Sequence, residues 1–171
     1  MEFGAVMQRL ESLGTEQARK TYRRHCIGLS TFGTSFGDMR KLAKEIKKDH
    51  ALALDLWATG IFEAQVVATM IADPKLLTLA EAEAWVSGMT THALTDELVN
   101  NLLVKAPYAD EQALVWIDSD REFVGRAGWH LVGGAAKAGR DRLDYAGLLG
   151  KIEREIHGAP NRKREAMNNA L

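Results

Sequence analysis

Residues 57–64 read WATGIFEA and residues 116–123 read WIDSDREF, and the Trp and Glu of the two stretches are each 59 positions apart. In each stretch an apolar helical pattern ends at the Trp, a short polar break follows, and a second helical pattern opens at an acidic residue. A carboxylate suits that position because it meets the positive end of the helix dipole. A recurring helix–break–helix unit is typical of α-helical repeat proteins, which usually bind partners on the surface lined by one helix of each unit.

The rest of the sequence also predicts helices. No segment alternates like a strand over a useful length, and the three prolines fall at breaks in the helical pattern. Helix caps are expected at Thr15, at Ser35 or Asp38, and at Thr78, which has capping-box spacing to Glu81. The fold class is therefore all-α, an α-α superhelix of about eleven helices in antiparallel pairs. Their expected ranges are 2–13, 15–26, 39–46, 49–57, 62–72, 78–89, 94–105, 109–117, 120–138, 141–157 and 161–171.

Length and composition indicate one soluble domain. The chain has 171 residues, of which 46% are hydrophobic and 26% charged, as is ordinary for a globular protein. The lone Cys26 excludes a disulfide framework and agrees with a reducing, cytoplasmic setting. The N-terminus lacks the pattern of a signal peptide, and no apolar run approaches the roughly 20 residues that span a bilayer. We expect a single cytoplasmic domain over residues 1–171.

The charges are unevenly distributed along the chain. Residues 1–50 hold 10 Lys and Arg against 6 Asp and Glu, residues 51–120 hold 2 against 11, and residues 121–171 hold 10 against 6. The basic segments include Arg40, Lys41, Lys44, Lys47 and Lys48 near one end, Arg162, Lys163 and Arg164 near the other, and residues 19–25. Such groups are either solvated faces of amphipathic helices or contacts to a phosphate backbone.

The chain ends inside a helical pattern. Residues 165–171 contain no Gly, Pro or polar cap, whereas the terminal repeat of a solenoid normally has a polar outer face. This pattern predicts that a further C-terminal helical unit is missing.

Asp96 and Arg126 are the most unusual polar residues. His92 and Asp96 are spaced i, i+4 and could share a helix face, but no third ligand at a suitable spacing favours a metal site. Asp96 could instead help to start the helix over 94–105. Arg126 lies in an apolar helical pattern, and a buried cation needs a partner. That partner is either a carboxylate, such as Glu122 or Asp96, or the phosphate of a ligand.

Other notable residues suit structural roles. Trp85, Trp129, His130 and Met167 fit packing positions, Glu63 fits the acid at a helix start, and Gly133 and Gly134 permit close helix packing. No nucleophile constellation, phosphate loop or dinucleotide fingerprint occurs.

Several of these stretches together resemble a known family. Residues 36–44 (FGDMRKLAK), Leu56-Trp57 with Gly60 and Glu63-Ala64, residues 96–98 (DEL), Trp116 with Ser119, and Arg126-Ala127 occur in the order and spacing of the HEAT-like DNA alkylation repair enzymes. The resemblance spans nearly the whole chain. It implies a HEAT-like repeat solenoid related to the glycosylases that remove N3- and N7-alkylated purines from DNA. Members of that family typically continue with another helical unit.

The resemblance also implies roles for individual residues. The family's catalytic aspartate maps to Asp96, where an ionised carboxylate would stabilise the oxocarbenium character that develops on the deoxyribose. The family's arginine maps to Arg126, where it would hold a phosphate near the lesion. No metal or organic cofactor is implied. Active members carry two tryptophans beside the lesion, and these positions align with His92 and Asn169, which offer a much smaller apolar face.

We therefore expect a DNA repair protein that binds alkylated duplex DNA and hydrolyses the N-glycosidic bond of the damaged purine. Asp96 is the candidate catalytic residue, and the candidate DNA contacts are Arg126, His92, Arg40, Lys41, Lys44, Arg162, Lys163 and Arg164. Two alternatives remain open. One is a DNA-binding member of the same fold without glycosylase activity, which His92 and Asn169 favour. The other is a protein-interaction scaffold, which the acidic middle segment favours.

Overall fold

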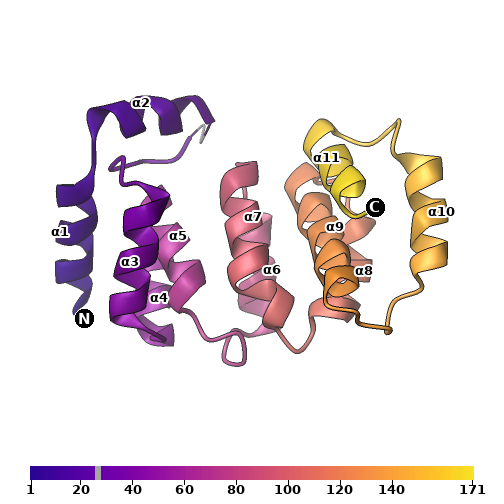
Figure 1. The fold of residues 1–171 in the computed structure, drawn as a ribbon, viewed down its shortest axis with the longest axis horizontal. Helices are drawn as coiled ribbons and strands as arrows, with labels where there is room; N and C mark the ends of the chain where they lie inside the picture. The colour runs from indigo at the N-terminus through magenta and orange to yellow at the C-terminus, as the bar shows by residue number, and fades with distance from the viewer. Residues whose placement is uncertain (26–27) are drawn as a thin grey trace. The chain divides into compact units, whose positions relative to one another are not determined.

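The computed structural model describes residues 1–25 and 28–171 (Figure 1). These residues form eleven α-helices, one short 3-10 helix and no β-strand, which confirms the all-α prediction. They divide into two compact units, residues 1–77 and 78–171. The expectation of one domain over the whole chain stays a prediction.

Unit 1 contains the first five helices: α1 (Phe3–Leu13), α2 (Glu16–His25), α3 (Phe36–Ile46), α4 (His50–Ala58) and α5 (Phe62–Ile71). The end predicted for the second helix, Cys26, lies outside the described residues. Helix α5 is the centre of this unit, because α1, α3 and α4 all pack against it and nearly all of its side chains are buried. An isolated bridge between Ser30 and Ile61 fixes the loop before α3 beside the start of α5.

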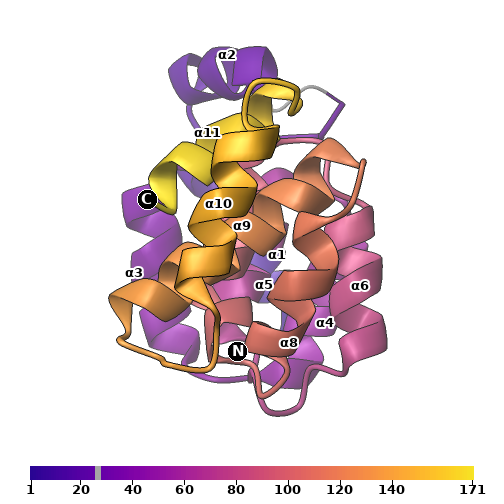
Figure 2. The same ribbon diagram turned by 90° about the vertical axis from the view of Figure 1, so that its right-hand side faces the viewer.

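Unit 2 contains α6 (Leu79–Ser87), α7 (His92–Asn101), η1 (Leu103–Lys105), α8 (Ala109–Ile117), α9 (Glu122–Lys137), α10 (Tyr145–Glu155) and α11 (Asn161–Asn169). Helix α9 is the centre of this unit, since α6, α7, α8 and α11 pack against it (Figure 2). Its buried residues include Trp129, Leu131 and Val132, and also the charged Arg126. A buried cation in the second turn of the core helix points to a defined polar site nearby.

The caps predicted at Thr15, at Ser35 or Asp38 and at Thr78 are confirmed, but the helix starts predicted at residues 94 and 141 are wrong. Thr15 accepts the Ala18 backbone N–H, Ser35 rather than Asp38 caps α3, and Thr78 forms a full capping box with Glu81. The start predicted at residue 94 is wrong, because Thr91 caps α7 and the helix begins at His92. Asp96 therefore lies inside α7 and does not help to start it. Helix α10 begins at Tyr145, because the Asp144 side chain caps it by accepting the Gly147 backbone N–H.

Glycine allows the closest contacts of α9, as predicted for Gly134 but not for Gly133, where a Cβ would meet its nearest atom at an ordinary 3.4 Å. A Cβ built on Gly134 would lie 2.8 Å from the Val104 side chain. An even tighter approach occurs at Gly128, where a Cβ would lie 2.6 Å from the Ile117 backbone nitrogen. Helices α8 and α9 can pack at this distance only because residue 128 has no side chain.

In the parts of the chain that the structure describes, no helix combines the length with the apolar character that a membrane crossing needs.

Candidate functional site

Asp96 and Arg126 form a bidentate ion pair in unit 2. Arg126 Nε donates to Asp96 Oδ1 at 2.7 Å, and Arg126 Nη2 donates to Asp96 Oδ2 at 2.7 Å. The Arg126 side chain is 2% exposed and the Asp96 side chain is 27% exposed. Two parallel charge-assisted hydrogen bonds of this kind fix both distance and orientation. The geometry confirms Asp96 as the carboxylate partner that the sequence left as one of the alternatives for Arg126.

Arg126 also connects α9 to α11. Its Nη1 donates to the Arg162 carbonyl oxygen and to Glu165 Oε2, each at 2.9 Å. Arg162 forms a second bond to the same Glu165 carboxylate, at 3.1 Å. Four hydrogen bonds therefore hold one buried guanidinium between α7 and α11. In this arrangement Arg126 is held by protein groups rather than presented to solvent.

Charge complementarity keeps these groups ionised. Burial opposes the charge of Arg126, but the hydrogen bonds and charges of Asp96 and Glu165 raise its pKa overall. Burial likewise opposes the charge of Glu165, and its pKa is lowered on balance by the hydrogen bonds and charges of Arg162 and Arg126. Arg126 and Glu165 are thus both ionised at neutral pH, and hydrogen bonds join them to Asp96 and Arg162 in one network.

Two histidines lie against this network. The His130 Nε2 atom lies 3.3 Å from Asp96 Oδ1 but forms no hydrogen bond there. Burial lowers the pKa of His130, and the charge of Asp96 offsets this only in part. Burial together with the charges of Arg162 and Arg126 lowers the pKa of His92. Both imidazoles are therefore neutral near pH 7. The sequence placed His92 at this site, whereas His130 was interpreted only as a packing residue.

The two matching glutamates bind backbone N–H groups. Glu63 lies in the first turn of α5 as expected, but its buried carboxylate accepts the N–H groups of residues 32–34 and the Thr31 hydroxyl. Glu122 accepts the backbone N–H of Arg162 at 2.6 Å, in the first turn of α11. Glu122 is thus not the carboxylate that binds Arg126. Glu63 therefore anchors the loop that precedes α3, and Glu122 anchors the first turn of α11.

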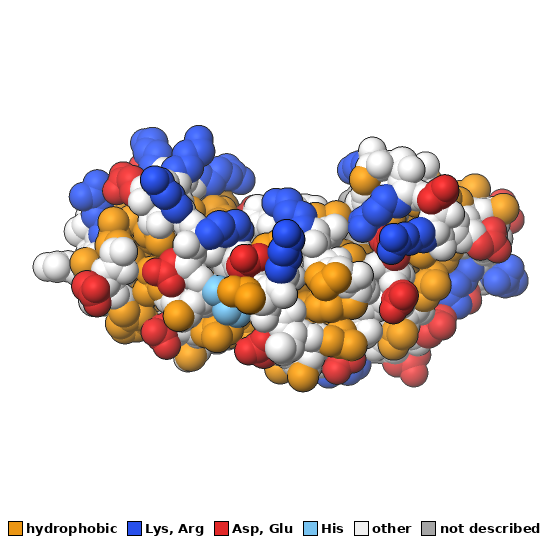
Figure 3. Space-filling view, turned by 90° about the horizontal axis from the view of Figure 1, so that it is seen from below, with side chains coloured by type: hydrophobic (Ala, Val, Ile, Leu, Met, Phe, Trp, Pro, Cys, Tyr) orange, Lys and Arg blue, Asp and Glu red, His pale blue; other side chains and the backbone are white. Residues whose placement is uncertain are grey.

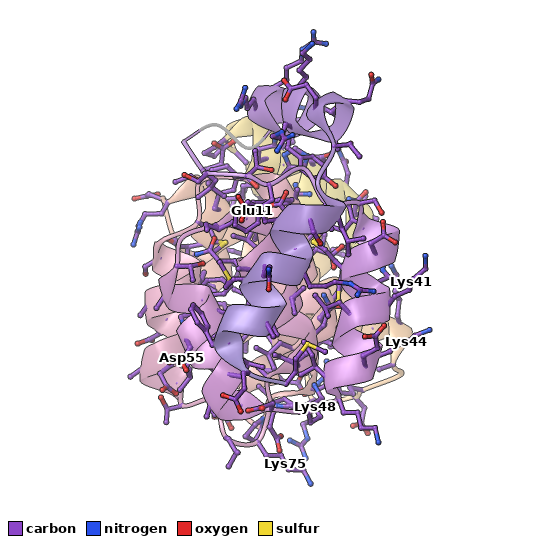
Figure 4. All side chains as sticks on the ribbon, turned by 90° about the vertical axis from the view of Figure 1, so that its left-hand side faces the viewer. Glu11, Lys41, Lys44, Lys48, Asp55 and Lys75 are labelled. Carbon is purple, nitrogen blue, oxygen red and sulfur yellow. The ribbon has the colours of Figure 1, made fainter. Side chains whose placement is uncertain are left out.

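The basic residues of α3 lie on the surface of unit 1. Arg40, Lys41 and Lys44 are all exposed. Figure 4 shows Lys41 and Lys44 projecting from the outer side of α3, and Figure 3 shows Lys and Arg side chains standing out from the surface. The Arg40 guanidinium lies over the Phe36 ring, and Lys41 pairs with Asp38 at 3.1 Å. Exposed cations on one helix are suited to phosphate contacts.

The three basic residues of α11 differ in exposure. Arg164 is exposed and Arg162 is partly exposed. Lys163 is 8% exposed, and its Nζ donates to the Ser119 carbonyl oxygen at 3.0 Å while its stem passes over Gly125. The helical spacing indicates that Lys163 is buried, because it places Lys163 on the same face of α11 as the buried Ala166 and Met167. Its placement favours a structural role over a contact to DNA.

A metal site is not visible in this geometry. Apart from residues 26 and 27, which the structure does not describe, no three His, Cys, Asp or Glu side chains come together in a way that could hold a metal ion.

A comparison with solved structures establishes the fold class of this chain. A solved structure superposes with a TM-score of 0.83 and 34% sequence identity, covering 99% of this chain and 74% of that chain. That structure represents a new family of proteins related to the HEAT-like repeat DNA glycosylases with affinity for branched DNA structures. The fold is accordingly that of the HEAT-like repeat proteins. No curated protein sequence matches this chain.

A match to a family model identifies the family of this chain. The profile of the DNA alkylation repair enzyme family matches residues 6–171. The chain belongs to the DNA alkylation repair enzyme family, as its motifs predicted.

Proposed function

We propose that this protein binds branched DNA through its exposed basic side chains and does not excise bases. A protein of the same fold, 34% identical over almost the whole chain, comes from a family described as having affinity for branched DNA structures. The exposed cations of α3, together with Arg162 and Arg164 of α11, provide groups that contact phosphates whatever the base sequence. Branched and linear DNA differ in the course of the sugar–phosphate backbone. Contacts to phosphates depend on that course and can therefore distinguish the two.

The single observation that carries this proposal is the pair of residues at the expected tryptophan positions. These are His92, which is half-buried beside the Asp96 network, and Asn169 near the end of α11. A tryptophan offers a broad apolar face against which a deoxyribose can pack, and neither an imidazole nor an amide replaces it. Without such faces, the sugar of a damaged nucleotide is poorly held next to Asp96.

Base excision is a second candidate function, and the partial exposure of Asp96 favours it. The Asp96 carboxylate is 27% exposed, so a ligand can reach it, and the chain belongs to a family of alkylation repair enzymes. In this reaction the N-glycosidic bond of an N3- or N7-alkylated purine in duplex DNA breaks, and the base leaves with the bonding electrons. Water then adds to C1′ and releases a proton. Asp96 would stabilise the positive charge that the sugar carries between these events.

Binding measurements test the first proposal. We expect a three-way junction to bind more tightly than a linear duplex of equal length, and the affinity to fall with salt by powers of ten for about 6–10 phosphate contacts between about 50 and 200 mM. Equal affinity for junction and duplex would contradict branch recognition. Absence of salt-sensitive binding to either DNA would favour the protein-interaction scaffold instead.

A base-release assay separates the two functions. Wild type and Asp96→Asn are incubated with DNA containing 7-methylguanine or 3-methyladenine, and free base is quantified after each variant is shown to be folded. We expect both proteins to release base only at the rate of DNA alone. Release by wild type that Asp96→Asn loses would establish excision and refute the non-catalytic proposal.

A further inference from the structure

Helix α2 differs from the other helices because the core does not require its side chains. No residue from Glu16 to Arg24 is buried, whereas every other α-helix of the described chain buries apolar side chains. Figure 1 shows α2 lying across the ends of α1 and α3, with its axis crosswise to theirs. A helix of ten residues is marginal by itself in water, so α2 depends on the contacts that hold it in place.

The loop before α3 holds α2 in a fixed position. The Tyr22 hydroxyl donates to the Thr34 carbonyl oxygen at 3.0 Å, and the Tyr22 ring lies edge-on to an aromatic ring of α5, with 5.2 Å between the ring centroids. Just before α2, the Thr15 N–H donates to the Gly33 carbonyl oxygen at 3.0 Å. The buried Glu63 carboxylate binds the N–H groups of this same loop. Because the loop is fixed, α2 is fixed with it.

Three cations project from α2 without a partner. Lys20, Arg23 and Arg24 are exposed, and in the part of the chain that the structure describes none of their side chains forms an ion pair or a hydrogen bond. Arg19, by contrast, pairs with Glu16 at 3.1 Å. Lys20 and Arg24 are spaced i, i+4 on one face, and like charges at this spacing disfavour a helix. The three cations therefore offer binding capacity that the fold does not use.

The chemistry of this helix fits a phosphate backbone. Exposed Lys and Arg side chains that contact phosphates release the counterions of DNA, and this release dominates the affinity. Between Glu16 and Arg24, no apolar side chain of α2 is exposed. A helix that binds a membrane surface or a hydrophobic groove of a protein needs such an apolar face. The exposed side of α2 thus suits nucleic acid better than either of these partners.

We propose that Lys20, Arg23 and Arg24 bind the phosphates of a second arm of a branched DNA, while the cations of α3 bind the first arm. The inference rests on the proposed function, which supplies the branched ligand. DNA has a persistence length of about 150 base pairs, so the phosphates of one duplex follow one direction over the length of a protein site. In Figure 4, Lys41 and Lys44 project sideways from α3, whereas α2 lies at the top of unit 1. Two crossed basic helices therefore fit two arms better than one straight duplex.

Two DNA ligands and two matched charge variants test this proposal. The ligands are a linear duplex and a three-way junction of equal length. The α2 variant, Lys20→Gln/Arg24→Gln, removes two charges, and Arg142→Gln/Arg154→Gln removes two exposed charges from unit 2 as the control. We expect the α2 variant to lose about tenfold or more in affinity for the junction, and its slope of log affinity against log salt to fall by about 2. Its affinity for the duplex, and both affinities of the control, should match those of wild type.

Two further measurements separate charge from folding. Lys20→Arg/Arg24→Lys exchanges the two cations and keeps the charge, so it should bind the junction like wild type. Lys20 and Arg24 have no partner to lose, so the temperature of thermal unfolding should be the same in all variants. A loss of junction affinity with unchanged thermal unfolding therefore reports on DNA contacts and not on the stability of α2.

Four results would overturn the proposal. Unchanged junction binding by the α2 variant would show that α2 does not contact DNA, and it would leave branch recognition intact if wild type still prefers the junction. An equal loss on junction and duplex would assign α2 to the same duplex as α3. An equal loss in the control variant would attribute the effect to net charge. Equal affinity of wild type for junction and duplex would refute the proposed function, and the second arm with it.

Discussion

Arg126 donates to both carboxylate oxygens of Asp96, although the two residues are 30 positions apart in the chain. The same guanidinium binds the Arg162 carbonyl and Glu165, so α7, α9 and α11 meet at one buried cation. This relationship makes Asp96 a structural residue as well as a candidate functional one. Any experiment on Asp96 must therefore separate loss of stability from loss of function.

Removal of the Asp96 carboxylate should destabilise the fold. Asp96→Ala leaves a buried guanidinium with two unpaired N–H groups, and we expect a loss of about 3 kcal/mol in the free energy of unfolding by urea. Asp118→Ala is the control, because Asp118 is 66% exposed in its pair with Lys151 and should change stability by less than about 1 kcal/mol. Equal effects of the two substitutions would mean that the Asp96–Arg126 pair contributes no more than a surface ion pair.

Two glycines of α9 should respond in opposite ways to the same substitution. A Cβ at residue 128 would lie 2.6 Å from the Ile117 nitrogen and 2.8 Å from the Trp116 carbonyl carbon, so Gly128→Ala should cost about 2–3 kcal/mol. At Gly133 the nearest atom is the Ala170 Cα at 3.4 Å, an ordinary contact. Gly133→Ala should therefore be neutral or stabilise by up to about 1 kcal/mol, since alanine favours a helix.

Urea unfolding of both variants checks this prediction. A loss of stability at Gly133 as large as that at Gly128 would show that the whole face of α9, and not the contact with α8, requires glycine.

The helices could be predicted from the sequence because their signals are local. Apolar spacing, the caps at Ser35 and Thr78, and the prolines at breaks all act within a few residues, and the structure confirms them. The start of α7 was missed because His92 and Ala93 are not apolar anchors. The cap that decides it is the Thr91 side chain, which accepts the Leu94 N–H. A threonine before a polar first turn is a weak signal when read alone.

The candidate site could be predicted only in part, because its contacts are long-range. The resemblance to the family indicated Asp96 and Arg126. A buried cation needs a partner, which limited the partner of Arg126 to a carboxylate or a phosphate. Only the fold identifies that partner as Asp96. Glu165 and His130 were missed as members of the network because nothing near them in the sequence marks them. The cluster of charges around Lys163 predicts an exposed DNA contact. The helical face that Lys163 shares with Ala166 and Met167 predicts burial instead, and the structure shows Lys163 buried.

Stability should fall on mild acidification because of the histidines beside Asp96. Burial lowers the pKa of His130 in the folded state below its ordinary value of 6.5, so the unfolded chain binds the proton more readily. The stabilisation is present above about pH 6.5 and is lost as the pH falls below that value. His92, whose pKa is lowered in the same direction, adds to the effect.

Unfolding measured from pH 7 down to pH 5 tests this prediction. We expect the free energy of unfolding of wild type to decrease on acidification and the decrease to be smaller in His130→Gln. Glu165, whose pKa is lowered below 4.5, loses its contribution only at more acidic pH and does not interfere in this window. An identical pH dependence in wild type and His130→Gln would exclude His130 as a source.

Exposed and buried lysines should affect the salt dependence of DNA binding differently. Lys41 is 76% exposed on α3, and Lys44 is exposed beside it, so both can release counterions from phosphates. The double variant Lys41→Ala/Lys44→Ala should lower the slope of log affinity against log salt by about 2, close to one for each phosphate contact. Lys163→Met should leave the slope unchanged, because the Lys163 ammonium binds the Ser119 carbonyl oxygen inside the protein. Titrations of a three-way junction at four salt concentrations measure these slopes. A slope that falls for Lys163→Met but not for the double variant would move the DNA contact from α3 to α11.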